Sequence, residues 1–399
     1  MHPTVSTARN EFANGWLSIL ASAMAISVGM MGVGFYTLGL FVQPLQAEFG
    51  WSRGEVSGAA TFQQLGIFLS APIVGLLADR IGTRPIAIAS FVVTPLAWLA
   101  LAHVGPSIAA WYGLWLMLSL AGCGTTPAIW ARIVSARFDK GRGLAMGLML
   151  VGTGVAAMLA PVLLGPVFAD DGWRSAVYAI AVATAVIGIP ASLLIGKEAR
   201  QGSTGQKAQR GRFERNRQTV VIAIAAVMLG FLVAALIVHL VPMLIDKGMD
   251  AAVAAQMAAG IGAAVIAARV VVGYLFDRFH APFVAAVFLL SPVISCGLLL
   301  WGGPVLPAAL LLGLAAGAEV DMLAYFTSRY AQPRNYGATY GMVLGLFCLG
   351  ASFGPMAFGW SVDWTGGYQS ALAVSGVALM AVVAMIATLG PYRTQDQRQ

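Results

Sequence analysis

Long hydrophobic runs separated by short polar segments make up most of the 399-residue chain. Twelve of these runs are long enough to cross a bilayer, which takes about 20 residues of helix. Lipid offers an exposed backbone no hydrogen-bond partner, so each run is expected to be a helix. The pattern predicts an all-α membrane protein with twelve transmembrane helices. They are expected at residues 17–46, 53–78, 86–104, 107–131, 143–169, 175–195, 219–245, 251–276, 282–301, 305–328, 336–362 and 370–390.

Small residues recur within the hydrophobic runs at helical spacing. Pairs of glycines four positions apart let two helix backbones approach closely in a membrane. We therefore expect helix–helix contacts at three such pairs, which are Gly313 and Gly317, Gly341 and Gly345, and Gly350 and Gly354.

The distribution of Lys and Arg predicts how the chain is oriented in the membrane. Only 10% of the residues are charged, and the net charge is +7. If the connections alternate between two sides, 19 of the 23 Lys and Arg fall on one side and three (Arg53, Arg174 and Lys247) on the other. By the positive-inside rule both termini are predicted to be cytoplasmic, in an integral plasma (inner) membrane protein. The basic residues near position 205 then read as a solvated cytoplasmic linker or a contact with anionic lipid, and nucleic acid is not an expected partner.

The chain contains an internal repeat. GLLADRIG, from Gly75, matches GYLFDRFH, from Gly273, at an offset of 198 residues. The offset also pairs Asp79 with Asp277 and Arg80 with Arg278. Repeats of this kind occur in secondary transporters, whose substrate sites lie near the membrane midplane. We expect two related six-helix halves, residues 1–195 and 219–399, joined by a linker at 196–218.

The first copy of the repeat resembles the G-x-x-x-D-R-x-G-x-R loop of the major facilitator superfamily, through Gly75, Asp79, Arg80, Gly82 and Arg84. The second copy is weaker and contains Gly273, Asp277 and Arg278. PLQAEFGWSRGEVS (44–57) and GAEVDMLAY (317–325) resemble the branch of monocarboxylate and oxalate/formate carriers. The resemblance implies a transporter with two pseudosymmetric six-helix bundles.

The two acids of the loop motif, Asp79 and Asp277, are candidate hydrogen-bond acceptors between the two halves. Asp79 and Asp277 stand at predicted cytoplasmic helix ends, where a carboxylate can accept hydrogen bonds from the N-terminus of another helix. Such a contact between the halves would act as a cytoplasmic latch. The alternative is topological, in which Arg80 and Arg84 only hold the loop inside.

Three charged residues lie deep within the predicted helices: Arg269, Glu319 and Asp321. A charge at mid-membrane costs about 2.5–3.5 kcal/mol on insertion scales, so such residues are functional candidates. Helix rise places all three about 12–15 Å from the cytoplasmic ends of their helices. The superfamily resemblance makes the eighth and tenth helices neighbours, so Arg269 can meet one acid. The two acids point about 200° apart, so at most one faces a central cavity.

Arg269 is the predicted substrate-binding residue. Its guanidinium offers a planar fork of donors to a carboxylate. In monocarboxylate carriers, which the chain resembles, a substrate-binding arginine stands at this place before the glycine of the second loop motif. The alternative is a structural ion pair with Glu319 or Asp321. The chain departs from the animal monocarboxylate carriers that it resembles, with Val265 in place of an acid and Phe35 in place of a lysine. Glu319 is the preferred proton-coupling residue, and Asp321 is the alternative.

Five further residues are candidate substrate contacts: Tyr36, Gln63, His239, Tyr325 and Tyr340. Each also has a structural interpretation. His239 and Gln63 could hydrogen-bond neighbouring helices, and tyrosines often anchor helices at membrane interfaces.

The predicted function is secondary active transport of a small organic anion, a monocarboxylate moved with a proton by a monomer. The main alternatives are an exporter of drugs or other metabolites, which would call for acids within the first six helices, and a sugar carrier. The asparagines that a sugar site would use all lie outside the helix cores. The four histidines are scattered, with no visible nucleophile–base pair, so neither an enzyme, a metal site nor a bound cofactor is expected.

Overall fold

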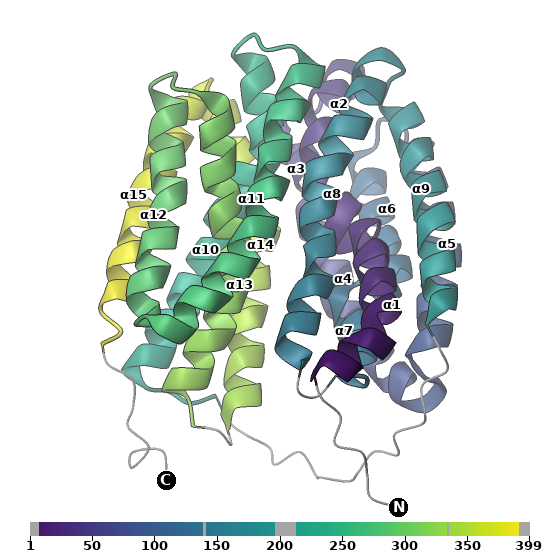
Figure 1. Ribbon diagram of the computed structural model, residues 1–399. Helices are drawn as coiled ribbons and strands as arrows, with labels where there is room; N and C mark the ends of the chain where they lie inside the picture. The colour runs from purple at the N-terminus through teal and green to yellow at the C-terminus, as the bar shows by residue number, and fades with distance from the viewer. Residues whose placement is uncertain (1–7, 139–140, 196–212, 333–334, 391–399) are drawn as a thin grey trace, which may run out of the picture. The chain divides into compact units, whose positions relative to one another are not determined.

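The computed structural model describes residues 8–138, 141–195, 213–332 and 335–390, and every regular element in these ranges is helical. Twelve helices of the described chain are long and apolar enough to cross a membrane. This confirms the twelve spans predicted from the hydrophobic pattern. Figure 1 shows them as ribbons, coloured from the N-terminus to the C-terminus.

Contacts between Cα atoms group the chain into two compact units. Unit 1 comprises Met1–Thr37 and Leu65–Ser203, and unit 2 comprises Leu38–Gln64 and Thr204–Gln399. The boundaries proposed from the sequence stay a prediction, and residues 196–212 of the proposed linker lie outside the described residues. The grouping adds that the segment Leu38–Gln64, which comes from the first two spans, packs with the second half of the chain.

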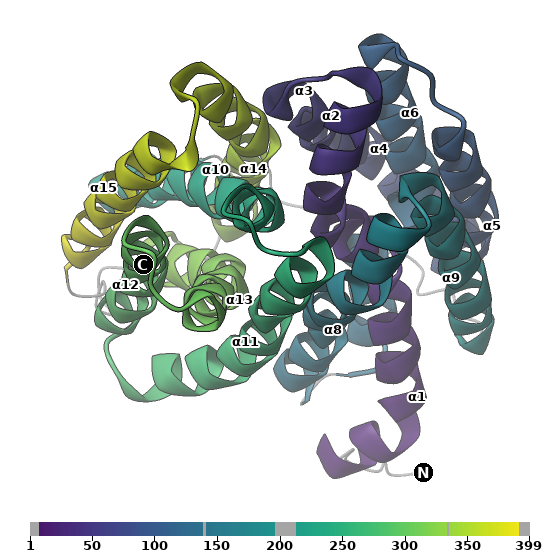
Figure 2. The ribbon, with the colours of Figure 1, turned by 90° about the horizontal axis from the view of Figure 1, so that it is seen from above.

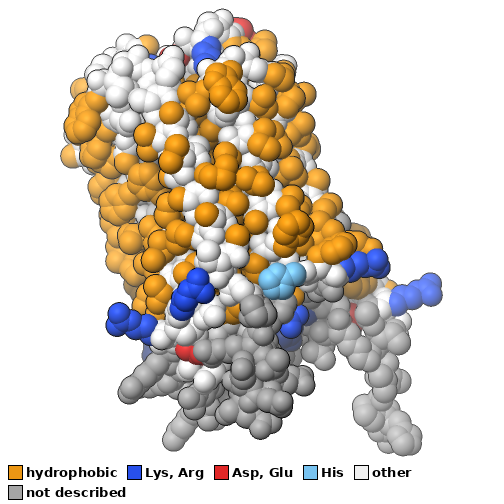
Figure 3. Space-filling view, turned by 90° about the vertical axis from the view of Figure 1, so that its left-hand side faces the viewer, with side chains coloured by type: hydrophobic (Ala, Val, Ile, Leu, Met, Phe, Trp, Pro, Cys, Tyr) orange, Lys and Arg blue, Asp and Glu red, His pale blue; other side chains and the backbone are white. Residues whose placement is uncertain are grey.

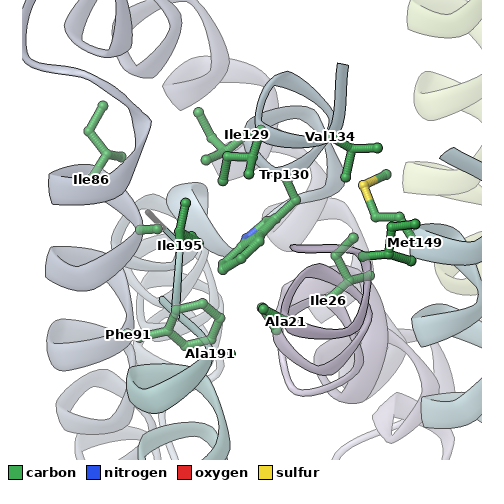
Figure 4. Close-up of a cluster of buried hydrophobic side chains, with 14 of the residues drawn as sticks. Ala21, Ile26, Ile86, Phe91, Ile129, Trp130, Val134, Met149, Ala191 and Ile195 are labelled. Atoms are coloured by element: carbon green, nitrogen blue, oxygen red, sulfur yellow. The ribbon is translucent and has the colours of Figure 1, made fainter. Parts of the chain in front are cut away.

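Unit 1 is held together by a cluster of large apolar side chains. The Trp130 indole is fully buried and lies among Ile26, Phe91 and Ile129 (Figure 4). Its Nε1–H donates to the Gly124 carbonyl at 3.2 Å, so the polar end of the ring is also satisfied. The elements of unit 1 are α1 (Ala8–Ser27), η1 (Met30–Gly34), most of α4 (Ala59–Ile81), α5 (Thr83–Ala102), α6 (Ile108–Ala121), η3 (Gly122–Thr125), α7 (Pro127–Ser135), α8 (Arg142–Asp170) and α9 (Trp173–Leu194).

Two spans of unit 1 are broken, which the sequence analysis did not predict. The first span begins at Ala8 and its α-helix ends at Ser27, after which Gly32 takes a non-helical conformation (φ −96°, ψ −106°). The expected continuous helix at 17–46 is therefore wrong. The fourth span, expected at 107–131, breaks after Ala121, where Thr126 is extended before Pro127. A residue before proline is pushed out of the helical region, which explains the second break.

The two breaks contact each other. The Met30 amide donates to the Thr125 hydroxyl at 3.1 Å, and that hydroxyl donates to the Gly122 carbonyl at 2.7 Å. A Cβ at Gly29 would lie 2.7 Å from the Thr125 carbonyl oxygen, so only glycine allows this approach. Backbone groups freed at membrane depth need protein partners, and here Thr125 of the fourth span supplies one to the Met30 amide of the first span.

Unit 2 contains long, unbroken helices, with α10 packed on α14 and α11 on α13 (Figure 2). Its elements are η2 (Leu38–Phe41), α2 (Val42–Phe49), α3 (Arg53–Ser57), α10 (Arg217–Asp246), α11 (Ala251–Arg278), α12 (Ala281–Leu300), α13 (Val305–Tyr330), α14 (Tyr336–Thr365) and α15 (Tyr368–Ala387). The α11–α13 contact confirms the expected neighbourhood of the eighth and tenth spans.

Glycines make these helix pairs close. A Cβ at Gly313 or Gly317 would lie 2.3 or 2.7 Å from a carbonyl oxygen of α11, and one at Gly350 or Gly354 would lie 2.1 Å from a carbonyl oxygen of α10. Two of the three predicted glycine contacts are thus confirmed. The third is wrong, because a Cβ at Gly341 or Gly345 would meet no atom of the described chain within 4 Å.

The outer surface of unit 2 suits a bilayer. The side chains of Phe283, Val287 and Ile294 on α12 and of Val374 and Val377 on α15 are more than half exposed. Figure 3 shows hydrophobic side chains over most of the height of one face, with most of its Lys and Arg gathered toward the lower edge. An apolar band bordered by cations is the pattern of a membrane-spanning surface.

Candidate functional site

The site centres on an ion pair between α11 and α13. The Nη1 atom of Arg269 lies 3.6 Å from Oδ2 of Asp321. The Arg269 side chain is 11% exposed, whereas that of Asp321 is 39% exposed. Of the two acids that Arg269 could meet, the structure therefore pairs it with Asp321.

The close packing of α11 on α13 positions this pair. A Cβ at Gly317 would lie 2.7 Å from the Val265 carbonyl oxygen and 2.8 Å from the Ala268 Cβ atom. Ala268 directly precedes Arg269, and Asp321 stands one turn beyond Gly317. The absent side chain at Gly317 thus fixes both the spacing and the register at which the guanidinium reaches the carboxylate.

Glu319 occupies a different environment from Asp321. It is only 8% exposed, and its Oε2 atom has no hydrogen-bond partner among the described residues. Burying a carboxylate oxygen without a donor is costly. Two acids two residues apart on one helix therefore differ, one paired with a cation and partly exposed, the other buried with an unsatisfied oxygen.

Tyr325 lies nearer the end of α13 that the sequence predicts to be cytoplasmic. Its hydroxyl donates to the Phe276 carbonyl at 3.1 Å and accepts from Nη2 of Arg329 at 2.9 Å. The Arg329 guanidinium also stands 4.9 Å from the centre of the Tyr325 ring. The hydroxyl joins α13 to the last turns of α11, and its predicted substrate role stays a prediction.

His239 belongs to a separate polar cluster in unit 2. It is fully buried, with Nε2 at 2.8 Å from the Pro355 carbonyl and 3.2 Å from the Ser57 hydroxyl, and Nδ1 at 3.3 Å from the Tyr368 hydroxyl. A carbonyl only accepts, so we assign the proton to Nε2, and Nδ1 then accepts from Tyr368. These bonds join four elements, which is the helix–helix role that the sequence left open for this residue.

The remaining predicted contacts lie in three different places. Gln63 is fully buried near the start of α4, in unit 2. Tyr340 lies on α14 with its ring stacked on that of Tyr336, at 5.8 Å between centroids and 2° between planes. Tyr36 lies in unit 1 between η1 and η2, edge-on to Phe35. Their roles stay predictions.

The loop motif is described only in part. Gly75, Asp79 and Arg80 fall in the last turns of α4, and Gly273, Asp277 and Arg278 fall at the end of α11. The side chains of Asp79 and Asp277 lie outside what the structure describes, so the cytoplasmic latch stays a prediction.

Other members of the motif make contacts within unit 1. Gly82 has a positive φ of 89°, which favours glycine, and starts α5. Arg84 donates from Nη2 to the Leu193 carbonyl at 3.2 Å, and Arg132 of α7 donates to the Gly75 carbonyl at 3.4 Å.

Sequence reasoning missed a charged cluster at the other end of unit 2. Arg53 of α3 pairs with Asp246 of α10 at 2.5 Å and with Asp363 of α14 at 3.6 Å. Arg53 is 193 positions from Asp246 and 310 positions from Asp363, and each of the three residues stands at the end of a hydrophobic run, where charges are usual. The sequence does carry a signal for the start of α3, because Ser52 and Glu55 form a capping box there. That signal is local and does not indicate the distant partners of Arg53. No group of three or more metal-ligating side chains occurs in the described parts of the chain.

Comparison with known proteins identifies the class. A model of the Major Facilitator Superfamily matches residues 24–355, so the chain belongs to this superfamily of transporters. The nucleoside transporter NupG has the same fold, with a TM-score of 0.76 at 12% identity over 94% of this chain and 100% of NupG.

Several curated relatives are monocarboxylate transporters. Human (Homo sapiens) monocarboxylate transporter 11 is 24% identical over 391 residues, which cover 92% of this chain and 81% of that protein. Rat (Rattus norvegicus) monocarboxylate transporter 13 is 26% identical over 394 residues, which cover 94% of this chain and 89% of that protein. The chain is thus a membrane-embedded transporter of the superfamily, similar over nearly its whole length to these proteins.

Proposed function

We propose that the chain is a secondary active transporter of a small monocarboxylate, moved together with a proton by alternating access. The observation that carries this proposal is Arg269, a cation on a membrane-spanning helix whose partner Asp321 is 3.6 Å away and partly exposed. A guanidinium forms two parallel, charge-assisted hydrogen bonds with a carboxylate. A substrate carboxylate can therefore replace Asp321 as the counter-ion without leaving the arginine unpaired.

The proton is assigned to Glu319 in this proposal. Its burial and its unsatisfied Oε2 atom favour an uncharged side chain in the membrane interior. Both acids stand on α13, close to the contact of Gly317 with α11. Substrate binding at Arg269 changes the local charge, and we propose that this change sets when Glu319 takes up and releases its proton.

The proposal includes the orientation and the working unit. Both termini face the cytoplasm of a plasma (inner) membrane protein, which the asymmetric distribution of Lys and Arg supports. Residues 1–195 and 219–399 form the two halves, with the linker 196–218 between them. One chain suffices, because Arg269, Glu319 and Asp321 all come from unit 2 of one chain.

Uptake by reconstituted protein tests the proposal. Purified protein in proteoliposomes is given radiolabelled acetate, pyruvate, lactate and oxalate, with and without an inward proton gradient. We expect a monocarboxylate to accumulate only with the gradient, by up to about tenfold per pH unit. Equal uptake with and without the gradient would contradict proton coupling. If none of these anions entered above the level of empty liposomes, the proposed substrate class would be wrong.

Arginine chemistry supplies the matched control. Arg269→Lys keeps the charge and loses the planar fork, whereas Arg9→Lys makes the same change at an exposed position in the first turn of α1. Loss of uptake in the first variant alone supports carboxylate binding at Arg269. Equal uptake in both variants would leave Arg269 as a structural ion.

A further inference from the structure

A cavity of about 190 Å³ opens at the end of unit 2 where α15 begins. It lies between the last residues of α10 and α12 and the turn that joins α14 to α15, and α15 packs against both α10 and α12 (Figure 2). The distribution of Lys and Arg predicts that this end of the unit faces outside. Cavities that hold drug-sized ligands have about 300–1,000 Å³, so this cavity suits a smaller chemical group.

Lys247 brings a cation without an acidic partner to this cavity. Its ammonium donates a hydrogen bond to the Leu299 carbonyl in the last turn of α12. No carboxylate of the described residues lies within ion-pair distance of this ammonium. Partial burial lowers the pKa of Lys247 from its ordinary value, and no acid offsets that effect. An ammonium has three N–H donors, so donors remain for a ligand in the cavity.

Asp246, the acid that lines the cavity, already has partners elsewhere. Its Oδ2 atom pairs with the Arg53 guanidinium at 2.5 Å, and Gln43 of α2 donates to its Oδ1 atom at 2.7 Å. Each carboxylate oxygen thus has a donor from the segment Leu38–Gln64. The uncompensated charge at the cavity is therefore the positive charge of Lys247.

The first turn of α15 adds partial positive charge to the same cavity. Gly366, Gly367, Tyr368 and Gln369 line it, and the helix has no side-chain cap at Gly367. The first amides of a helix carry unsatisfied N–H groups and favour an anion. The Tyr368 hydroxyl is engaged with His239 at 3.3 Å. The cavity therefore combines a full and a partial positive charge, which together suit a phosphate group.

Two exposed tryptophans mark the level of the cavity in the membrane. Trp301 directly follows the lining residue Leu300 and is 88% exposed. Trp364 stands two residues before the lining residue Gly366 and is 91% exposed. Tryptophan is enriched at the level of the lipid headgroups. A phosphate in the cavity would therefore lie where a bilayer carries its own phosphates.

Apolar surface continues from the cavity toward the middle of the membrane. Ile294 on α12 and Val374 and Val377 on α15 are more than half exposed, and they stand about 8–12 Å from the cavity along their helices. Figure 3 views the side of the molecule where α12 and α15 lie in Figure 1, and hydrophobic side chains cover most of its height. A soluble anion would use the charged part alone, whereas a phospholipid would also cover this apolar surface.

We propose that the cavity binds the phosphate group of an anionic phospholipid. The Lys247 ammonium and the first amides of α15 hold the phosphate, and an acyl chain lies along α12 and α15. The site is separate from the proposed substrate site, because Arg269, Glu319 and Asp321 do not line this cavity. It is also independent of the proposed function, since it requires neither a particular substrate nor a proton.

Native mass spectrometry of the purified, delipidated protein tests this site. Phosphatidylglycerol and phosphatidylcholine share the phosphate diester and differ in net charge. Each lipid is titrated separately, and the occupancy of the first bound lipid gives a dissociation constant. Phosphatidylglycerol should bind about fivefold more tightly, because the choline cation offsets the attraction to Lys247. Equal affinity for the two lipids would overturn the proposal.

Variants of the cation locate this preference in the cavity. Lys247→Gln keeps a donor for the Leu299 carbonyl but loses the charge, so the preference for phosphatidylglycerol should disappear, whereas Lys247→Arg should retain it. Arg174→Gln is the matched control, because it removes a cation on the same predicted side, in unit 1, that stacks on Trp173 at 4.3 Å. It should leave the preference unchanged. An unchanged preference in Lys247→Gln, or an equal loss in Arg174→Gln, would contradict a site at Lys247.

A second variant tests the cavity without removing the charge. Gly367→Leu is compatible with the extended backbone at this position (φ 179°), and its Cβ would meet only the end of the flexible Gln369 side chain. The added side chain should occupy space in the cavity and weaken phosphatidylglycerol binding by about fivefold or more. Thermal unfolding of each variant shows whether the fold is kept. Wild-type affinity in a folded Gly367→Leu protein would rule out binding in this cavity.

Soluble glycerol phosphate separates a lipid from a free phosphate. It carries the phosphate and glycerol groups without acyl chains, so it cannot cover the apolar surface of α12 and α15. At the concentration that saturates phosphatidylglycerol binding, glycerol phosphate should leave the bound lipid in place. Displacement of the lipid at equal concentration would mean that the cavity takes a free anion, and the phospholipid would be the wrong ligand.

Discussion

In unit 1 the buried polar groups are hydroxyls and backbone amides, whereas unit 2 buries charge. Two broken spans of unit 1 are joined through Thr125, whose hydroxyl accepts from Met30 and donates to Gly122. The long helices of unit 2 are unbroken, and two of them, α11 and α13, carry Arg269 and the pair Glu319 and Asp321. Glu319 is the one Asp, Glu, Lys or Arg below 9% exposure in the described parts of the chain.

The difference between the two units separates groups that stabilise the fold from groups that can bind an anion or a proton. A neutral hydroxyl that repairs a broken helix stabilises a fold but gives an anion no counter-charge. A cation next to one paired and one unpaired acid can exchange partners and protons. We therefore assign recognition and coupling to unit 2, and the predictions below are arranged to break or sharpen that assignment.

The largest effect is expected where unit 2 positions its charges. Gly317→Leu forces a side chain against the Val265 carbonyl and Ala268. Overpacking of this kind costs about 1–3 kcal/mol, and the displacement of α11 should abolish transport. Uptake and thermal unfolding would be measured together. Gly341→Leu is the matched control, because a Cβ there meets no described atom within 4 Å, and equal loss in both variants would contradict a specific role for the 317 contact.

The next effect concerns the two acids of α13. Glu319→Gln removes the proposed proton carrier, so accumulation driven by one pH unit should fall from about tenfold to equality. Exchange of labelled for unlabelled substrate should continue, since it needs no net proton movement.

Asp321→Asn provides the contrast within the same helix. It removes the counter-ion of Arg269, whose side chain is only 11% exposed, so the loss of stability should be about 3–5 kcal/mol. Proton-driven accumulation should persist. If Asp321→Asn abolished accumulation and Glu319→Gln did not, the two assignments would have to be exchanged.

The smallest effect on transport is expected in unit 1. Thr125→Val removes the hydroxyl between the two broken spans, and loss of a buried partner costs about 1–3 kcal/mol. The unfolding temperature should fall, while substrate affinity stays unchanged. Thr125→Ser, which keeps the hydroxyl, should restore most of the stability. A large loss of substrate affinity in Thr125→Val at unchanged stability would mean that unit 1 contributes to substrate binding.

The sequence predicted features that depend on composition and local spacing. Apolar length was enough for the twelve spans, and glycine spacing was enough for the contact at Gly317. The cost of charge in lipid was enough to single out Arg269. These signals are local, so a single sequence carries them.

Other features depend on contacts between distant segments. At the break after Ser27, the Met30 amide donates to the hydroxyl of Thr125, which is 95 positions away. Which acid meets Arg269 depends on the rotation of α13 against α11, and the hydrophobic pattern does not fix that rotation. The attachment of Arg53 to Asp363 joins residues 310 positions apart.

Carboxylate binding to Arg269 variants tests the central claim most directly. Isothermal titration of the purified protein with the monocarboxylate that it accumulates, for wild type, Arg269→Lys and Arg269→Ala, measures affinity without requiring transport. Loss of the charge-assisted fork should weaken binding by about 10- to 100-fold in Arg269→Lys, and more in Arg269→Ala. Wild-type affinity in both variants would contradict recognition of the substrate by unit 2 through Arg269.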